Sequence, residues 1–114
     1  MRTFIFPFKS EERQGRIAEV WRGLENNVVV LNSYPLDKET RMPTDFDFHE
    51  FVSFLFGKTD ASETVNLVFD GMPTAKQFKA LMKPMPCRLR IHTGNPLCGD
   101  TDEVFHHDGN RITD

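Results

Sequence analysis

The sequence predicts a single small α/β domain of three layers, in which a mostly parallel sheet of about four strands lies between helices. Its 114 residues are enough for one hydrophobic core and too few for two. Segments with the apolar pattern of strands alternate with segments that carry a helical apolar stripe, in the order β-α-β-α-β-α-β. The connections are short, as in parallel sheets whose crossovers are helices. We assign residues 1–97 to this domain and residues 98–114 to a C-terminal hairpin or acidic tail.

The first three elements lie within residues 3–31. Residues 3–8 are a run of aromatic and aliphatic side chains that predicts a strand ending at Pro7. Ser10 then marks the start of a helix with acidic residues in its first turn. The buried stripe of this helix is expected to consist of Ile17, Val20, Trp21 and Leu24. Residues 28–31 are a continuous β-branched run, which predicts a central strand covered on both faces.

The next three elements follow a long polar loop at residues 32–44. The second helix should run from about Asp45 to Gly57, with Thr44 or Asp45 as its cap. A third strand is predicted over residues 64–70. A tight turn leads from this strand into the third helix, where Pro73 suits the first helical position.

Residues 87–92 form the fourth predicted strand, and one of its faces is polar. Arg88, Arg90 and His92 point to one side, while apolar side chains point to the other. Such a strand lies at the edge of a sheet or is left uncovered by any helix, because burying two arginines is costly. An open edge can pair with a second copy of the chain to give a homodimer. Alternatively, the C-terminal segment, with a turn at Asp108-Gly109-Asn110, folds back and places its acids against the arginines.

The composition argues against several classes of protein. The chain has 14 basic and 17 acidic residues and a net charge of -3, which argues against general nucleic-acid binding. No apolar run reaches the roughly 18 residues that a membrane helix needs. Cys87 and Cys98 are too few for a disulfide scaffold. We expect both to be reduced thiols in a cytoplasmic protein.

No complete catalytic or cofactor motif is present. His49-Glu50 begins like the helix of a zinc protease, but Ser53 occupies the position that the second histidine requires. Cys98, His106 and His107 are residue types that bind zinc, yet their spacing matches no common site. Glycine-rich phosphate and dinucleotide motifs are missing as well. The sequence therefore predicts neither a cofactor nor a metal ion, and it favours a protein without enzymatic activity.

A ligand site in such a domain is expected at the carboxyl ends of the parallel strands, where helix N-termini also converge. Polar residues placed there could hold a phosphate or a carboxylate, with Asp70 or His92 as acid or base. These residues are Lys9, Ser10, Arg13, Ser33, Tyr34, Asp70, Thr74, His92 and Thr93. A small enzyme or ligand-binding domain is therefore one of two functional hypotheses.

The other hypothesis is an interaction protein, such as an accessory factor or inhibitor, that binds another protein or itself. The second helix has seven apolar residues within 11 positions, and all but Phe46 span an arc of roughly 200°, about twice what one core needs. The third helix carries lysines on its solvent side, close to the arginines of the fourth strand. The residues expected at an interface are Phe54, Phe56, Lys76, Lys79, Lys83, Arg88 and Arg90. We favour this hypothesis because no catalytic motif is complete.

Overall fold

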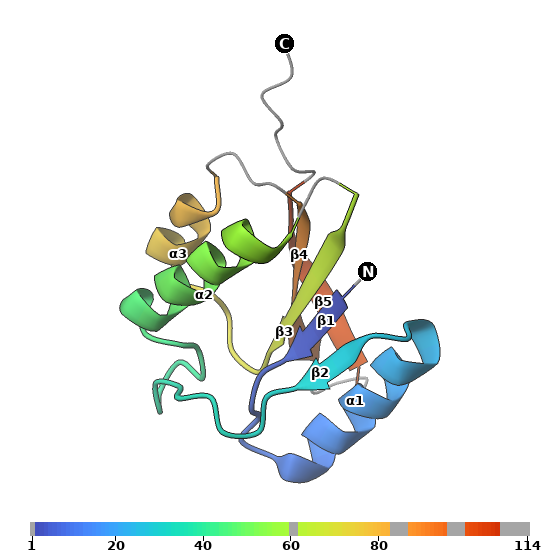
Figure 1. Cartoon of the computed structure of the whole chain (residues 1–114). Coiled ribbons are helices and arrows are strands. Elements are labelled where there is room, and N and C mark those ends of the chain that lie inside the picture. The colour runs from blue at the N-terminus through green and yellow to red at the C-terminus, as the bar shows by residue number, and fades with distance from the viewer. Residues whose placement is uncertain (1, 60–61, 83–86, 96–99, 108–114) are drawn as a thin grey trace.

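In the described part of the chain, five strands form one sheet in the order β2-β1-β3-β4-β5 (Figure 1). The computed structural model describes residues 2–59, 62–82, 87–95 and 100–107. The pairs among the first four strands are parallel, and only β5 runs antiparallel, to β4. The strands are β1 (Arg2–Ile5), β2 (Val28–Val30), β3 (Thr64–Phe69), β4 (Arg88–Asn95) and β5 (Asp100–His107). The predicted α/β class with a mostly parallel sheet is confirmed.

Among the described residues, three helices cover the two faces of the sheet. One of them, α1 (Glu11–Leu24), lies on one face, and α2 (Asp45–Lys58) and α3 (Ala75–Ala80) lie together on the other (Figure 1). A small core between α1 and the sheet is formed by Ile5, Phe8, Ile17, Ala18, Trp21 and Val68. The larger core on the other face includes Phe6, Val52, Leu55, Leu67, Phe69 and Ile91. Within the described ranges, no helix has both the length and the apolar character of a membrane span.

Each helix begins at a hydroxyl side chain that accepts a hydrogen bond from the backbone three residues further on. These caps are Ser10 for α1, Thr44 for α2 and Thr74 for α3. Gln77 completes a capping box with Thr74, and its amide nitrogen also lies 3.0 Å from the backbone oxygen of Pro43. The starts of α2 and α3 are therefore tied together. Thr44 is confirmed as the cap of α2, whereas Pro73 precedes the cap of α3 and is not inside the helix.

The second strand lies at an edge of the sheet, so the prediction of a central strand at residues 28–31 is wrong. Of the described strands, it pairs with β1 alone. Val28 and Val30 pack against the α1 core, whereas Val29 points to the other face and is partly exposed. A β-branched run identifies a strand but does not determine its neighbours. The interior positions belong to β1, β3 and β4, and β3 is buried from Val65 to Phe69.

The fourth strand is not an open edge, because β5 pairs along its outer side. The alternative, in which the C-terminal segment folds back over this strand, is confirmed, and one of its acids faces one of the arginines, since Glu103 Oε1 lies 2.8 Å from Arg90 Nε. Arg90 Nε also donates to His106 Nδ1 at 3.3 Å. The predicted turn at 108–110 lies outside the described residues. A homodimer formed by strand pairing would have to use β2 or β5, which are the edges of the described sheet.

The buried stripe of α1 differs from the predicted one. The buried residues are Gln14, Ile17, Ala18 and Trp21. Val20 is partly exposed, and Leu24 is 70% exposed. Both sets have the spacing i, i+3, i+4, i+7, so periodicity alone does not separate them. A polar amide, Gln14, therefore occupies a position in the buried face of the helix.

A buried polar cluster lies beneath α1. Glu25, the C-terminal cap of α1, accepts hydrogen bonds from Thr3 Oγ1 and, at 2.9 Å, from Asn66 Nδ2. Asn66 Oδ1 lies 3.0 Å from His92 Nε2, and because an amide oxygen only accepts, His92 is the donor. The His92 ring also packs edge-to-face on Trp21, with 4.7 Å between ring centroids. This cluster joins α1 to β1, β3 and β4.

We expect Cys87 to react slowly with alkylating reagents in the folded protein. Its thiol is part of the larger core, and burial raises the pKa of Cys87, so little thiolate is present at neutral pH. In a Cys98→Ser background, iodoacetamide should modify Cys87 about 100-fold more slowly than it modifies the same chain in denaturant. Equal rates under the two conditions would show that the thiol is accessible in the native state.

Candidate functional site

Asp70 stands where an open α/β sheet most often binds a ligand. The connection that follows β1 passes through α1 on one face, and the connection that follows β2 passes through α2 on the other, so the crossovers diverge between β1 and β3 (Figure 1). Ligands in such folds bind outside the carboxyl ends of the diverging strands. Asp70 directly follows β3. The structure brings four of the predicted residues together here: Lys9, Ser10, Arg13 and Asp70.

Asp70 uses both of its carboxylate oxygens for contacts within the protein. Oδ2 accepts a hydrogen bond from the backbone nitrogen of Lys9 at 2.9 Å and lies 3.7 Å from Arg41 Nε. Oδ1 lies 3.6 Å from Arg13 Nη1. The sequence did not single out Arg41, because no spacing in the 32–44 loop shows that the loop returns to β3. We refer to Asp70, Arg13 and Arg41 as the aspartate cluster.

Two glycines allow the backbone to approach the aspartate cluster. A methyl group at Gly71 would lie 1.7 Å from the carbonyl oxygen of Thr40, and one at Gly94 would lie 2.4 Å from Arg13 Nη2. Arg41 itself has a φ of 57°, a left-handed conformation that is unfavourable for a residue with a side chain. Because the chain itself packs so closely around Asp70, the geometry gives this carboxylate a structural role as an ion-pair partner.

Asp37 holds the loop that carries Arg41. Its Oδ1 accepts hydrogen bonds from the backbone nitrogens of Thr40 at 3.0 Å and Glu39 at 2.9 Å. These bonds, that from Thr40 first, hold the pKa of Asp37 below its ordinary value. The backbone nitrogen of Asp37 also donates to the carbonyl of Met42 at 2.8 Å, and Met42 is buried in the larger core. The turn is therefore anchored on both sides of Arg41.

Tyr34 and Ser33 lie after β2, away from the polar contacts of the aspartate cluster. The Tyr34 ring packs edge-to-face on Phe6, and its hydroxyl donates to the backbone oxygen of Asp47 at 3.1 Å. Burial raises the pKa of Tyr34, and the carboxylates of Asp47 and Glu50 raise it further. Ser33 is exposed. Tyr34 therefore connects the long loop to the start of α2.

The other residues of the predicted ligand site serve elsewhere in the fold. Thr74 caps α3, and His92 is bonded to Asn66 beneath α1. Thr93 pairs with Asp102 in the β4-β5 ladder. The predicted site residues therefore lie in separate parts of the fold. Several of them are in contact with one another at the aspartate cluster, and the others lie elsewhere.

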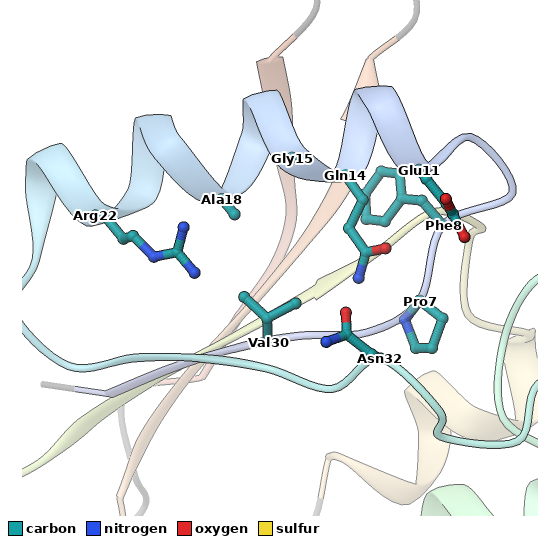
Figure 2. A pocket seen from close by; sticks show the side chains of 9 residues that line it. All are labelled: Pro7, Phe8, Glu11, Gln14, Gly15, Ala18, Arg22, Val30 and Asn32. Atoms are coloured by element: carbon teal, nitrogen blue, oxygen red, sulfur yellow. The ribbon is translucent and has the colours of Figure 1, made fainter.

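A groove between α1 and β2 has the size of a small-molecule site. Its volume is about 490 Å³, within the range of about 300–1,000 Å³ that is usual for ligand pockets (Figure 2). Its lining is Pro7, Phe8, Glu11, Gln14, Gly15, Ala18, Arg22, Val30 and Asn32. We call it the α1 groove. The sequence did not indicate this groove, because the predicted apolar stripe of α1 left Gln14 outside the buried face.

A second groove, with a volume of about 300 Å³, lies between α2 and α3. Its lining is Asp45, Phe46, Phe48, His49, Lys76, Gln77 and Ala80. Phe46 is 72% exposed, although it is a large aromatic residue. Lys76, predicted for an interface, lies here with its Nζ 3.5 Å from Asp45 Oδ2. We call it the α2–α3 groove.

The other residues predicted for an interface differ in their exposure. Those that are exposed are Phe54, Lys79 and Arg88. Arg90 is partly buried and paired with Glu103. The side chain of Phe56 and the whole of Lys83 lie outside the part of the chain that the structure describes.

The described residues contain no group of three or more His, Cys, Asp or Glu side chains that could hold a metal ion. His106 contacts Arg90 and Glu103, and His107 is buried in β5. Cys98, the third residue considered for a metal site, lies outside the described residues.

The α1 groove, the α2–α3 groove and the aspartate cluster are the candidate functional features described above. No protein-family model matches the chain, and comparisons with curated proteins and with solved structures give no match either.

Proposed function

We propose that the protein is an interaction module that binds a segment of another protein in the α2–α3 groove. The observation that carries the proposal is Phe46, a phenylalanine that is 72% exposed and lines an apolar groove. Exposed apolar patches mark interaction sites, and aromatic side chains supply much of the binding energy of interfaces.

The composition of α2 explains why aromatic rings remain outside the core. Phe48, Val52 and Leu55 are buried against the sheet and fill the available inner side. Phe46 and Phe54 are left on the outer side, where they are more than 45% exposed, at 72% and 47%. Solvent exposure of Phe46 beside an apolar groove is unfavourable for a monomer unless a partner covers the ring. The apolar arc that predicts an interface at Phe54 and Phe56 leaves out Phe46, so the proposed interface lies at a different part of α2.

The charges around the groove favour an acidic partner. Lys76 and Lys79 of α3 are both exposed, and Lys76 lines the groove. Asp45, an acid in the groove, is paired with Lys76. A segment with an apolar anchor residue flanked by Asp or Glu would therefore complement the groove in shape and charge.

Replacing Phe46 by serine should weaken the binding of such a segment by about tenfold or more, because the ring contributes an anchor contact. The probe is a library of short random peptides displayed on phage and selected against the immobilised protein. We expect the selected peptides to share an apolar residue flanked by acids. Their dissociation constants for the wild type and for Phe46→Ser can then be measured by fluorescence anisotropy.

Phe54→Ser is the matched control, since Phe54 lies on the same helix and is exposed but does not line the groove. It should change the dissociation constant less than about threefold, and neither variant should lower the melting temperature strongly. Lys79→Glu should weaken binding most at low salt, where charges are poorly screened. Selected peptides that lack acids, or that bind Phe46→Ser as tightly as the wild type, would contradict the proposal.

A further inference from the structure

One residue that lines the α1 groove, Gln14, has a buried polar side chain. The residue is only 8% exposed, and its amide nitrogen has no hydrogen-bond partner among the described residues. The side chain extends from α1 into the groove, toward Asn32 (Figure 2). A buried amide nitrogen without a partner is costly and uncommon in folded proteins. The groove therefore presents a desolvated donor that a bound acceptor would satisfy.

The geometry points to a binding site for a small organic carboxylate in the α1 groove. The Arg22 guanidinium lies on one side of Gln14, and the Glu11 carboxylate lies on the other, so the groove has a positive and a negative end (Figure 2). A carboxylate bound between Arg22 and Gln14 would face the positive charge and accept a hydrogen bond from Gln14 Nε2. This site is separate from the α2–α3 groove, which lies on the opposite face of the sheet.

The remaining lining residues restrict the rest of the ligand. Pro7, Phe8, Ala18 and Val30 give the groove apolar walls, which favour a ligand with an apolar body. The Glu11 carboxylate opposes a second negative charge on the ligand. A monoanion such as an aromatic or branched aliphatic acid therefore fits better than inorganic phosphate.

Gly15 allows the groove to be filled without removing a polar contact. It lines the groove, and a methyl group at this position would meet no atom within 4 Å. A leucine there would occupy the space of the ligand and would also favour the helix, because glycine is a poor residue inside helices. Gly23 lies on the same helix, is equally unobstructed and does not line the groove. Gly23→Leu is therefore the matched control for Gly15→Leu.

The test is a titration of the protein with benzoate, isovalerate and their primary amides, followed through the backbone amide signals by NMR. A carboxylate should bind about tenfold more tightly than its amide, and the shifted signals should come from residues 7–22 and 30–32. Arg22→Gln should remove the difference between acid and amide. Gly15→Leu should weaken carboxylate binding by at least about tenfold, whereas Gly23→Leu should leave it unchanged.

Gln14→Leu separates binding from folding. Removing the unpartnered amide should leave the melting temperature at or above that of the wild type, while the affinity for the carboxylate falls by about tenfold. Phe46→Ser should leave this affinity unchanged, so failure of this site and failure of the proposed function are distinguishable. The inference is overturned if no carboxylate binds with a dissociation constant below ~10 mM, or if Gly15→Leu binds as well as Gly23→Leu. Equal binding of inorganic phosphate would also overturn it.

Discussion

Replacing Asp70 by alanine should lower the free energy of unfolding by about 3 kcal/mol, because two partly buried guanidiniums then lose their counter-charge. Arg13 and Arg41 both lie within ion-pair distance of this carboxylate, and the backbone of Lys9 donates to it. Arg13 Nε and Nη2 are buried and have no hydrogen-bond partner in the part of the chain that the structure describes, so Asp70 supplies the main compensation for that charge there. The loss would loosen both the start of α1 and the 37–42 loop.

Urea denaturation of Asp70→Ala, Arg13→Met and the double variant measures this effect. The double variant should be less destabilised than the sum of the two single variants by about 1 kcal/mol or more, because the two side chains interact directly. Glu19→Ala is the control, since Glu19 is an exposed acid on α1 and should change stability by less than about 0.5 kcal/mol. If Asp70→Ala behaves like Glu19→Ala, the aspartate cluster does not stabilise the fold.

Replacing Asn66 by leucine should cost about 2 kcal/mol or more, although leucine is the more apolar residue. Asn66 donates to Glu25 and accepts from His92, and it lies on β3 in the interior of the sheet. Leucine would leave the Glu25 carboxylate with one hydrogen bond fewer and the His92 N–H facing an apolar group. Buried polar networks of this kind lose more than one pairwise bond when a central member is removed.

Asn26→Leu provides the same chemical change at an exposed position beside α1 and should be nearly neutral. Denaturant unfolding of the two variants gives the difference directly. An Asn66→Leu protein as stable as Asn26→Leu would mean that the polar cluster contributes nothing beyond the volume it fills. Thr3→Val should have a smaller effect than Asn66→Leu, because Thr3 contributes one bond to Glu25 and accepts a long one from Asn66.

The class of fold could be predicted because local signals were strong. Ser10 and Thr44 are helix caps in the sequence and in the structure, and the apolar runs at β1, β3 and β4 became strands. The positions of β2 and β4 in the sheet could not be predicted, because pairing partners depend on long-range contacts. A run of β-branched residues has the same appearance in an interior strand and in an edge strand such as β2, so the run alone does not give the strand's place in the sheet.

The candidate sites were harder to predict for a related reason. Arg41 reaches Asp70 because hydrogen bonds to Asp37 hold the loop and because Arg41 has a left-handed backbone conformation. No periodic pattern in the sequence predicts either feature. The rotation of α1 was ambiguous because two overlapping stripes have the same spacing. The more apolar of the two stripes predicts that Leu24 is buried and Gln14 is exposed. The reverse holds, and the α1 groove follows from it.

The place of β5 at the end of the sheet has a consequence for the order in which the chain can fold. β1 is made first but pairs with β3, as Arg2 with Val65, so the interior of the sheet must wait for a distant segment. Before β5 pairs with it, β4 is the edge of an incomplete sheet and has unpaired backbone groups. Partly folded chains can associate through such an edge. Arg88 and Arg90 lie on that edge, and charged residues there discourage pairing with another chain. In the finished fold Arg90 pairs with Glu103, so the same side chain that protects the unfinished sheet later helps to hold its last strand.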